Sequence, residues 1–310
     1  MALLRSCTNA LVPQVFAYGL DDQNSVTSPF ILLEFLPGST AMDEARPYNI
    51  TDGDPVPNQF RQAFYRSMAT THASSILLSQ TKRVQIASAR LPQIGSVSRS
   101  QDGSFTVGPI PGLGGPFNTA ASFIRAWSAN VKYPYQRKYL QEHVPDAFLD
   151  EILAGAEEFP NRLARLADNG KHFIRDGPFP IRHPDLFHSN VIVTKNFDVL
   201  GVIDWEGACT VPWELIDSPC FLTTVPRLLN PPELYDEAGY PLDKDVARKW
   251  EDGKAYVTMV QEAERDGNTD SNLSDILGNR DVQDLAGIIH LFAQGKMGFY
   301  GRALAYFEIN

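Results

Sequence analysis

The feature that most constrains the fold is a cluster of short apolar segments joined by tight polar connections. They span residues 179–182, 191–194 and 199–203. Segments this short and this rich in Val and Ile are typical of buried β-strands. The first connection would project Asp185 and Asn190 into a shared space, and the last segment would end by presenting Asp204. Functional side chains often lie on loops that rigid strands hold in place, so this cluster is the candidate site.

The polar residues of the cluster have the spacing of a kinase catalytic loop. In kinases, His-x-Asp is followed by an Asn five residues after the Asp, and a later Asp binds the metal. Here His183, Asp185, Asn190 and Asp204 follow that order. We predict Asp185 as the catalytic base and Asn190 and Asp204 as magnesium ligands, because Mg²⁺ prefers oxygen donors. His183 is a candidate catalytic residue, although a supporting hydrogen bond within the loop suits it better.

The rest of the chain divides between a few strands and many helices. Residues 14–18 and 30–35 flank turn-forming residues and predict a β-hairpin, and the Gly-, Ser- and Pro-rich segment 91–115 fits a small β-hairpin or a surface excursion. Apolar residues at helical spacing predict helices over residues 58–78, 119–130, 135–143, 147–168, 243–266 and 282–307. This order predicts an α+β fold with most of its mass in a helical lobe.

Charge and hydropathy limit the partners of the protein. The formal net charge of the 310 residues is −10 and the pI is about 5.1, which disfavours binding to nucleic acid or to an anionic membrane surface. No segment approaches the roughly 20 apolar residues that a transmembrane helix needs. We therefore expect a cytoplasmic protein that binds neither nucleic acid nor membrane. The oligomeric state cannot be predicted from these properties.

The motifs resemble those of the aminoglycoside phosphotransferase and choline kinase-like family. The matching runs are HPDLFHSNVIV at 183–193, GVIDWE at 201–206 and FILLEFLPG at 30–38, and VPWE at 211–214 is similar to a fungal branch. The resemblance implies a protein kinase-like fold and transfer of the ATP γ-phosphoryl group, with Mg²⁺, to a hydroxyl of a small molecule. It also implies that Glu34, Phe35 and Leu36 meet the adenine of the nucleotide. Acidic residues in the helical lobe would suit a cationic acceptor.

The sequence departs from the family before residue 37. A complete member has a glycine-rich loop, a strand Lys and a helix Glu ahead of the hinge, and none precedes Glu34 here. We therefore expect a truncated N-terminal β-lobe at residues 1–37, a mainly helical C-terminal lobe at 38–310, and weak or absent activity. A non-catalytic binding protein of pseudokinase type is one alternative. A metal-dependent hydrolase is another, and its ligands would be His183, Asp185, His188 and Asp204.

Overall fold

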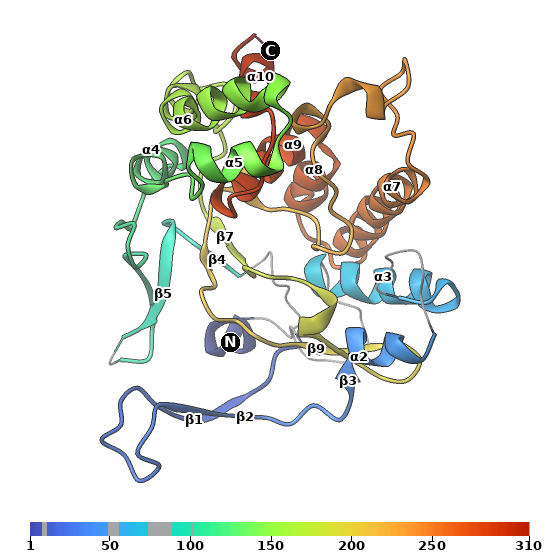
Figure 1. Ribbon diagram of the computed structural model, residues 1–310. Coiled ribbons are helices and arrows are strands. Elements are labelled where there is room, and N and C mark those ends of the chain that lie inside the picture. The colour runs from blue at the N-terminus through green and yellow to red at the C-terminus, as the bar shows by residue number, and fades with distance from the viewer. Residues whose placement is uncertain (8–10, 49–55, 74–88, 101, 310) are drawn as a thin grey trace.

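The chain forms an α+β structure with a mainly helical C-terminal part, as the sequence predicts. The computed structural model describes residues 1–7, 11–48, 56–73, 89–100 and 102–309 (Figure 1). The strands lie in the lower half of the view, and α4 to α10 gather above them. None of the helices in the described part of the chain has the length and apolarity needed to cross a bilayer.

The strands form three small antiparallel sheets. The first pairs β1 (Val15–Gly19) with β2 (Phe30–Leu33). The second has the order β4-β7-β10-β5-β6, with β4 Arg90–Leu91, β5 Gly95–Arg99, β6 Phe105–Gly108, β7 Phe179–Arg182 and β10 Cys209–Thr210. The third has the order β3-β8-β9, with β3 Ser39–Thr40, β8 Val191–Val193 and β9 Val199–Val202. The candidate site lies where the chain passes from the second sheet into the third.

Helices supply the remaining regular structure. The α-helices are α1 Ala2–Cys7, α2 Ala41–Ala45, α3 Asn58–Ala73, α4 Ala120–Asn130, α5 Arg137–His143, α6 Asp146–Asp168, α7 Lys244–Asp266, α8 Asn272–Gly278, α9 Arg280–Ala293 and α10 Tyr300–Ile309. Short 3-10 helices span Arg46–Tyr48, His188–Asn190, Trp213–Leu215, Arg227–Leu229 and Pro232–Leu234. Local sequence explains some of the ends. Thr119 caps α4 because its hydroxyl accepts from the Ser122 N–H at 3.1 Å, while the Thr119 N–H donates to the Ser122 hydroxyl at 3.3 Å.

Most predicted elements are confirmed, and one is wrong. The hairpin predicted within 91–115 is the antiparallel pair β5–β6. The helix predicted over 58–78 is described to Ala73, and residues 74–78 lie outside the described part. The single helix predicted over 282–307 is instead α9 and α10. It breaks because Gly295 adopts φ +70, a left-handed conformation that ends helices and that glycine adopts without strain.

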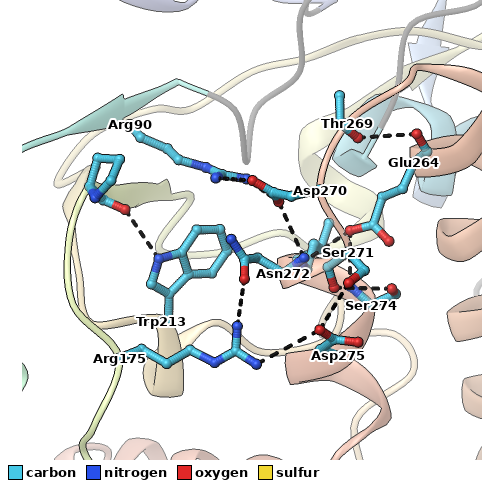
Figure 2. A network of polar contacts seen from close by, with 12 residues as sticks. Arg90, Arg175, Trp213, Glu264, Thr269, Asp270, Ser271, Asn272, Ser274 and Asp275 are labelled. Carbon is cyan, nitrogen blue, oxygen red and sulfur yellow. Dashed lines mark hydrogen bonds and ion pairs between the residues drawn. The ribbon is translucent and has the colours of Figure 1, made fainter.

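A polar network ties the turn between α7 and α8 to the second sheet (Figure 2). Arg90 of β4 donates to both carboxylate oxygens of Asp270, at 2.5 and 2.8 Å, and its guanidinium lies 4.6 Å from the ring centre of Trp213. In α7, Glu264 accepts from the Ser274 N–H at 3.1 Å and so caps the start of α8. The network fixes α7 and α8 relative to the strands that hold the candidate site.

The N-terminal hairpin stands apart from the rest of the chain (Figure 1). Its strands leave the large side chains of Phe16, Tyr18, Ile31 and Leu32 more than half exposed. A two-stranded sheet buries little apolar surface and is marginally stable by itself. The proposed boundary at residue 37 between a small and a large lobe stays a prediction.

Two helical glycines, Gly155 and Gly253, test how closely the helices pack. A Cβ on Gly155 of α6 would lie 2.7 Å from the Gly301 nitrogen in α10. We expect Gly155→Ala to lower the free energy of unfolding by about 1–3 kcal/mol, because the two helices must separate. Gly253 of α7 has no heavy atom within 4 Å of such a Cβ. Gly253→Ala should therefore raise the free energy of unfolding by as much as about 1 kcal/mol, because alanine has the higher helix propensity. Urea unfolding of both variants measures this, and a stabilised Gly155→Ala would contradict the close crossing.

Candidate active site

The loop after β7 is fixed by the imidazole of His183. Its Nε2 lies 2.8 Å from the carbonyl oxygen of Ile203, and its Nδ1 accepts from the Asp185 N–H at 3.2 Å. An acceptor at Nδ1 and a carbonyl at Nε2 define the neutral ring protonated on Nε2. Burial lowers the pKa of His183, which also favours the neutral ring. Both ring nitrogens are therefore engaged with the backbone.

Asp185 and Asn190 are in direct contact. The Asn190 side-chain amide donates to a carboxylate oxygen of Asp185 at 3.0 Å and to the Asp185 backbone carbonyl at 2.9 Å. Asn190 is only 8% exposed, whereas Asp185 is exposed to solvent. Because both bonds use the amide nitrogen, the amide oxygen remains an acceptor for a cation.

Asp204 follows β9 at a point that the backbone ties to Asn190. The Ile203 N–H donates to the Asn190 carbonyl at 2.9 Å, one step beyond the β8–β9 pair Val191–Val202. Asp204 then adopts φ +60, a left-handed conformation that is strained for a residue with a Cβ. The two residues predicted as metal ligands therefore lie on adjoining turns. Asp204 is exposed.

The segment predicted to meet adenine runs beside the same strand. Leu36 contacts Gly201 of β9, three residues before Asp204. Glu34 accepts from the Arg5 guanidinium and from the Gln14 N–H, both at 2.9 Å, so its side chain is engaged with the N-terminal segment. Phe35 is 83% exposed. The three residues thus have different surroundings, and only Leu36 approaches the site strand.

The donors present suit a hard divalent cation. A carboxylate and an amide oxygen are ligands that Mg²⁺ accepts, with water filling the other positions. Within the described residues, no three His, Cys, Asp or Glu side chains gather as a metal site. The hydrolase alternative requires such a group at His183, Asp185, His188 and Asp204, and it is therefore disfavoured. The Nδ1 of His188 is buried without a hydrogen-bond partner, and its ring packs against Phe187 with centroids 4.1 Å apart.

A partly buried ion pair behind the loop was not predicted. Arg182, next to His183, donates to the two carboxylate oxygens of Asp217 at 3.1 and 2.8 Å, and its Nη2 lies 3.2 Å from the His290 Nδ1. Burial opposes the charged form of both partners. Their mutual attraction outweighs it, so the pKa of Asp217 is lowered and that of Arg182 is raised. Asp217 and His290 are 35 and 108 residues from Arg182, and no local pattern marks them.

A cavity of about 680 Å³ adjoins this ion pair. It lies between α7, the end of α8, α9 and the segment 217–227, and Asp217, Cys220 and His290 form part of its wall. The Cys220 N–H donates to the carbonyl of Leu186 at 3.0 Å, one residue after Asp185. The loop after β7 and the cavity wall are thus joined by a direct hydrogen bond.

One carboxyl group on the cavity wall has a shifted pKa. Burial raises the pKa of Asp284 to about 6, and the Asp281 carboxylate adds to the increase. Arg280, 3.8 Å away, and Arg227 act in the opposite direction without overcoming burial. Near neutral pH the Asp284 carboxyl therefore holds a proton for part of the time.

A known protein family matches most of the chain. The model of the phosphotransferase enzyme family matches residues 1–213, more than half of the chain. The chain therefore belongs to the phosphotransferase enzyme family. This family assignment agrees with the kinase-like α+β class predicted from the sequence.

Comparisons with individual proteins add little to this assignment. Among solved structures, the chain is similar to a "putative aminoglycoside phosphotransferase" from Ralstonia eutropha JMP134. The two are 15% identical with a TM-score of 0.43, over 99% of this chain and 78% of that one. No curated protein matches the chain.

The strained backbone at Asp204 predicts a gain in stability when its Cβ is removed. Asp204→Gly should raise the free energy of unfolding by about 1 kcal/mol, because glycine adopts a positive φ without steric cost. Glu206→Gly, two residues on and also exposed, is the matched control and should be neutral or destabilising, since its φ is not positive. Thermal unfolding compares the two variants. Equal losses of stability would mean that residue 204 is not strained.

The raised pKa of Asp284 predicts a pH-dependent gain in stability. Its contribution is fully present below the ordinary carboxyl pKa and is lost as the pH rises through about 6. Asp284→Asn should therefore raise the free energy of unfolding by about 1–3 kcal/mol at about pH 7.5, and the gain should shrink toward about pH 5. Denaturation of both proteins at the two pH values measures this gain in the free energy of unfolding. A gain that grows on acidification would contradict the assignment.

Proposed function

We propose that this protein transfers the γ-phosphoryl group of ATP to a hydroxyl group of a small molecule. The observation that supports it best is the linked pair of hydrogen bonds from the Asn190 amide to Asp185 and from the Ile203 N–H to Asn190, at 3.0 and 2.9 Å. They bring one carboxylate and two oxygen ligands onto adjoining turns. Phosphoryl transfer needs these few parts, because positioning and charge stabilisation supply most of the catalysis.

In this proposal Asp185 is the base. Its carboxylate is exposed, so an acceptor hydroxyl can approach it, and it takes the proton of that hydroxyl as the oxygen becomes a nucleophile. The Asn190 amide holds one of its oxygens and so orients the other toward the acceptor. Asn190 and Asp204 would hold Mg²⁺, which when bound neutralises charge on the nucleotide phosphates.

We assign His183 a positioning role. Its ring is neutral and both nitrogens bond to backbone groups, at Ile203 and Asp185, so it has no lone pair or proton free for an acceptor. It fixes the direction in which Asp185 leaves the loop. The backbone at residues 34–36 would meet adenine, and such contacts depend little on side-chain identity.

We also propose a cytoplasmic location, where ATP is abundant, and a relationship to the fungal branch. A pseudokinase-type binding protein, which would bind nucleotide without transferring phosphate, is the alternative.

Nucleotide binding and turnover test the proposal separately. ATP with Mg²⁺ at a hundred times its Kd should stabilise the protein by about 2.7 kcal/mol in thermal unfolding. Asp204→Asn should reduce this Mg²⁺-dependent stabilisation. Asp185→Asn should leave the stabilisation unchanged and lower any phosphate transfer to hydroxyl compounds by about a hundredfold or more.

Glu206→Gln is the matched control and should change neither measurement, because the proposal gives its exposed side chain no role. A full shift without detectable transfer would identify the binding protein. No shift with ATP and Mg²⁺ would exclude both functions.

A further inference from the structure

The cavity beside the catalytic loop has an unusual charge for so acidic a protein. Among the described residues that line it, the cations are Arg227, Lys249, Lys254 and Arg280, and the carboxyl groups are Asp217 and Asp284. Asp217 is paired with Arg182, which lies outside the lining, so the four cations face one further carboxyl group, that of Asp284. The wall of the cavity is therefore positive although the whole chain carries a net charge of −10.

Several of these cations lack a strong intramolecular partner. Within the described residues, Arg227 and Lys249 make no ion pair, and Arg280 reaches Asp284 only at 3.8 Å. The Arg280 guanidinium lies 4.0 Å from the ring centre of Trp250, a contact that holds it in place without neutralising it. Lys254 is paired with Glu251 at 2.8 Å and contributes less. Uncompensated charges facing a cavity favour a ligand of opposite sign.

One of these positive charges, Arg280, lies away from the loop after β7. Arg280, Asp284, Gly287 and His290 follow one another along the cavity side of α9. His290 lies next to Arg182, at the end bonded to the loop, and Arg280 is the first residue of the helix. Ten residues of helix separate these two by about 15 Å. The start of α9 adds the partial positive charge of a helix N-terminus at the distal end.

We propose that the acceptor is an elongated alcohol with an anionic group, a carboxylate or a phosphate, remote from the hydroxyl. This inference rests on the proposed phosphotransferase function and names the substrate class of that site. The hydroxyl lies toward Asp185, the anionic group lies near Lys249 and Arg280, and the chain between them contacts Val257 and Leu291 on the cavity wall. A polycationic acceptor would meet like charges at the distal end, contrary to the expectation from composition.

Binding of matched probes tests the inference without relying on catalysis. The probes are ω-hydroxyoctanoate, the eight-carbon amino alcohol and the eight-carbon diol, which differ only in the charge at one end. Calorimetry with the full chain, without nucleotide or Mg²⁺, should give an affinity for the carboxylate about tenfold above that for the diol, with the amine weakest. Added salt should weaken binding of the carboxylate and leave that of the diol unchanged. Measuring the monophosphate ester of the same diol compares the affinity for a phosphate with that for a carboxylate.

Substitutions on the cavity wall test where the anionic group of the probe binds. Lys249→Gln and Arg280→Gln should each weaken carboxylate binding about fivefold and leave the diol unchanged. Lys249→Glu should reverse the preference toward the amine. The matched controls are Lys244→Gln and Arg265→Gln, on the same helix as Lys249 but outside the cavity. Unchanged diol affinity in each variant shows that the cavity remains folded.

The outcomes separate this inference from the proposed function. Equal affinities for the three probes, no binding of any probe at millimolar concentration, or equal effects of the control variants would overturn the anionic assignment. Displacement of the carboxylate by ATP would identify the cavity as the nucleotide site and also overturn it. Carboxylate binding without phosphate transfer would leave the assignment standing and count against the phosphotransferase function. Phosphate transfer to the amino alcohol, and to neither of the other probes, would support the phosphotransferase function and overturn the anionic assignment.

Discussion

The peptide groups of Ile203 hold the candidate active site together. Its N–H donates to the Asn190 carbonyl at 2.9 Å, and its carbonyl oxygen lies 2.8 Å from the His183 Nε2. A hydrogen bond of this kind contributes only about 1 kcal/mol net, but leaving a buried partner unsatisfied costs more. The Trp205 ring packs edge-on against His183, with centroids 4.6 Å apart, and covers this junction. Asp204 leaves β9 immediately afterwards, so its direction is set by groups that cannot shift separately.

A second connection runs from the site into the helical part of the chain. Arg182 precedes the loop and binds Asp217 and His290, which both line the cavity. A buried ion pair is weak evidence for stability, because removing two charges from water costs about as much as their attraction returns. Its value here is geometric. It holds the start of the loop after β7 at a fixed place on the cavity wall, so that the cavity and the carboxylate of Asp185 keep a constant relation.

Sequence predicted the local parts of this arrangement and missed the long-range ones. The order His183, Asp185, Asn190 and Asp204 is readable because short strands and tight turns leave few conformations for the residues between them. The break at Gly295 was missed because periodic apolar residues continue on both sides of it. The positions of Asp217 and His290 behind the loop, and of Arg280 on the cavity wall, could not be predicted, because tertiary packing brings these residues together and no motif marks them.

The net charge of the chain likewise does not predict the charge inside the cavity. A net charge of −10 is a property of the whole surface, and it argues against nucleic-acid binding because such partners contact large areas. A small ligand experiences only the charges within about a Debye length, roughly 8–10 Å in physiological salt. On the wall of the cavity, Asp217 is paired with Arg182, whereas Lys249 makes no ion pair among the described residues. Composition therefore constrains which macromolecules this chain can meet, but the sign of its small-molecule ligand depends on which side chains the fold has already neutralised.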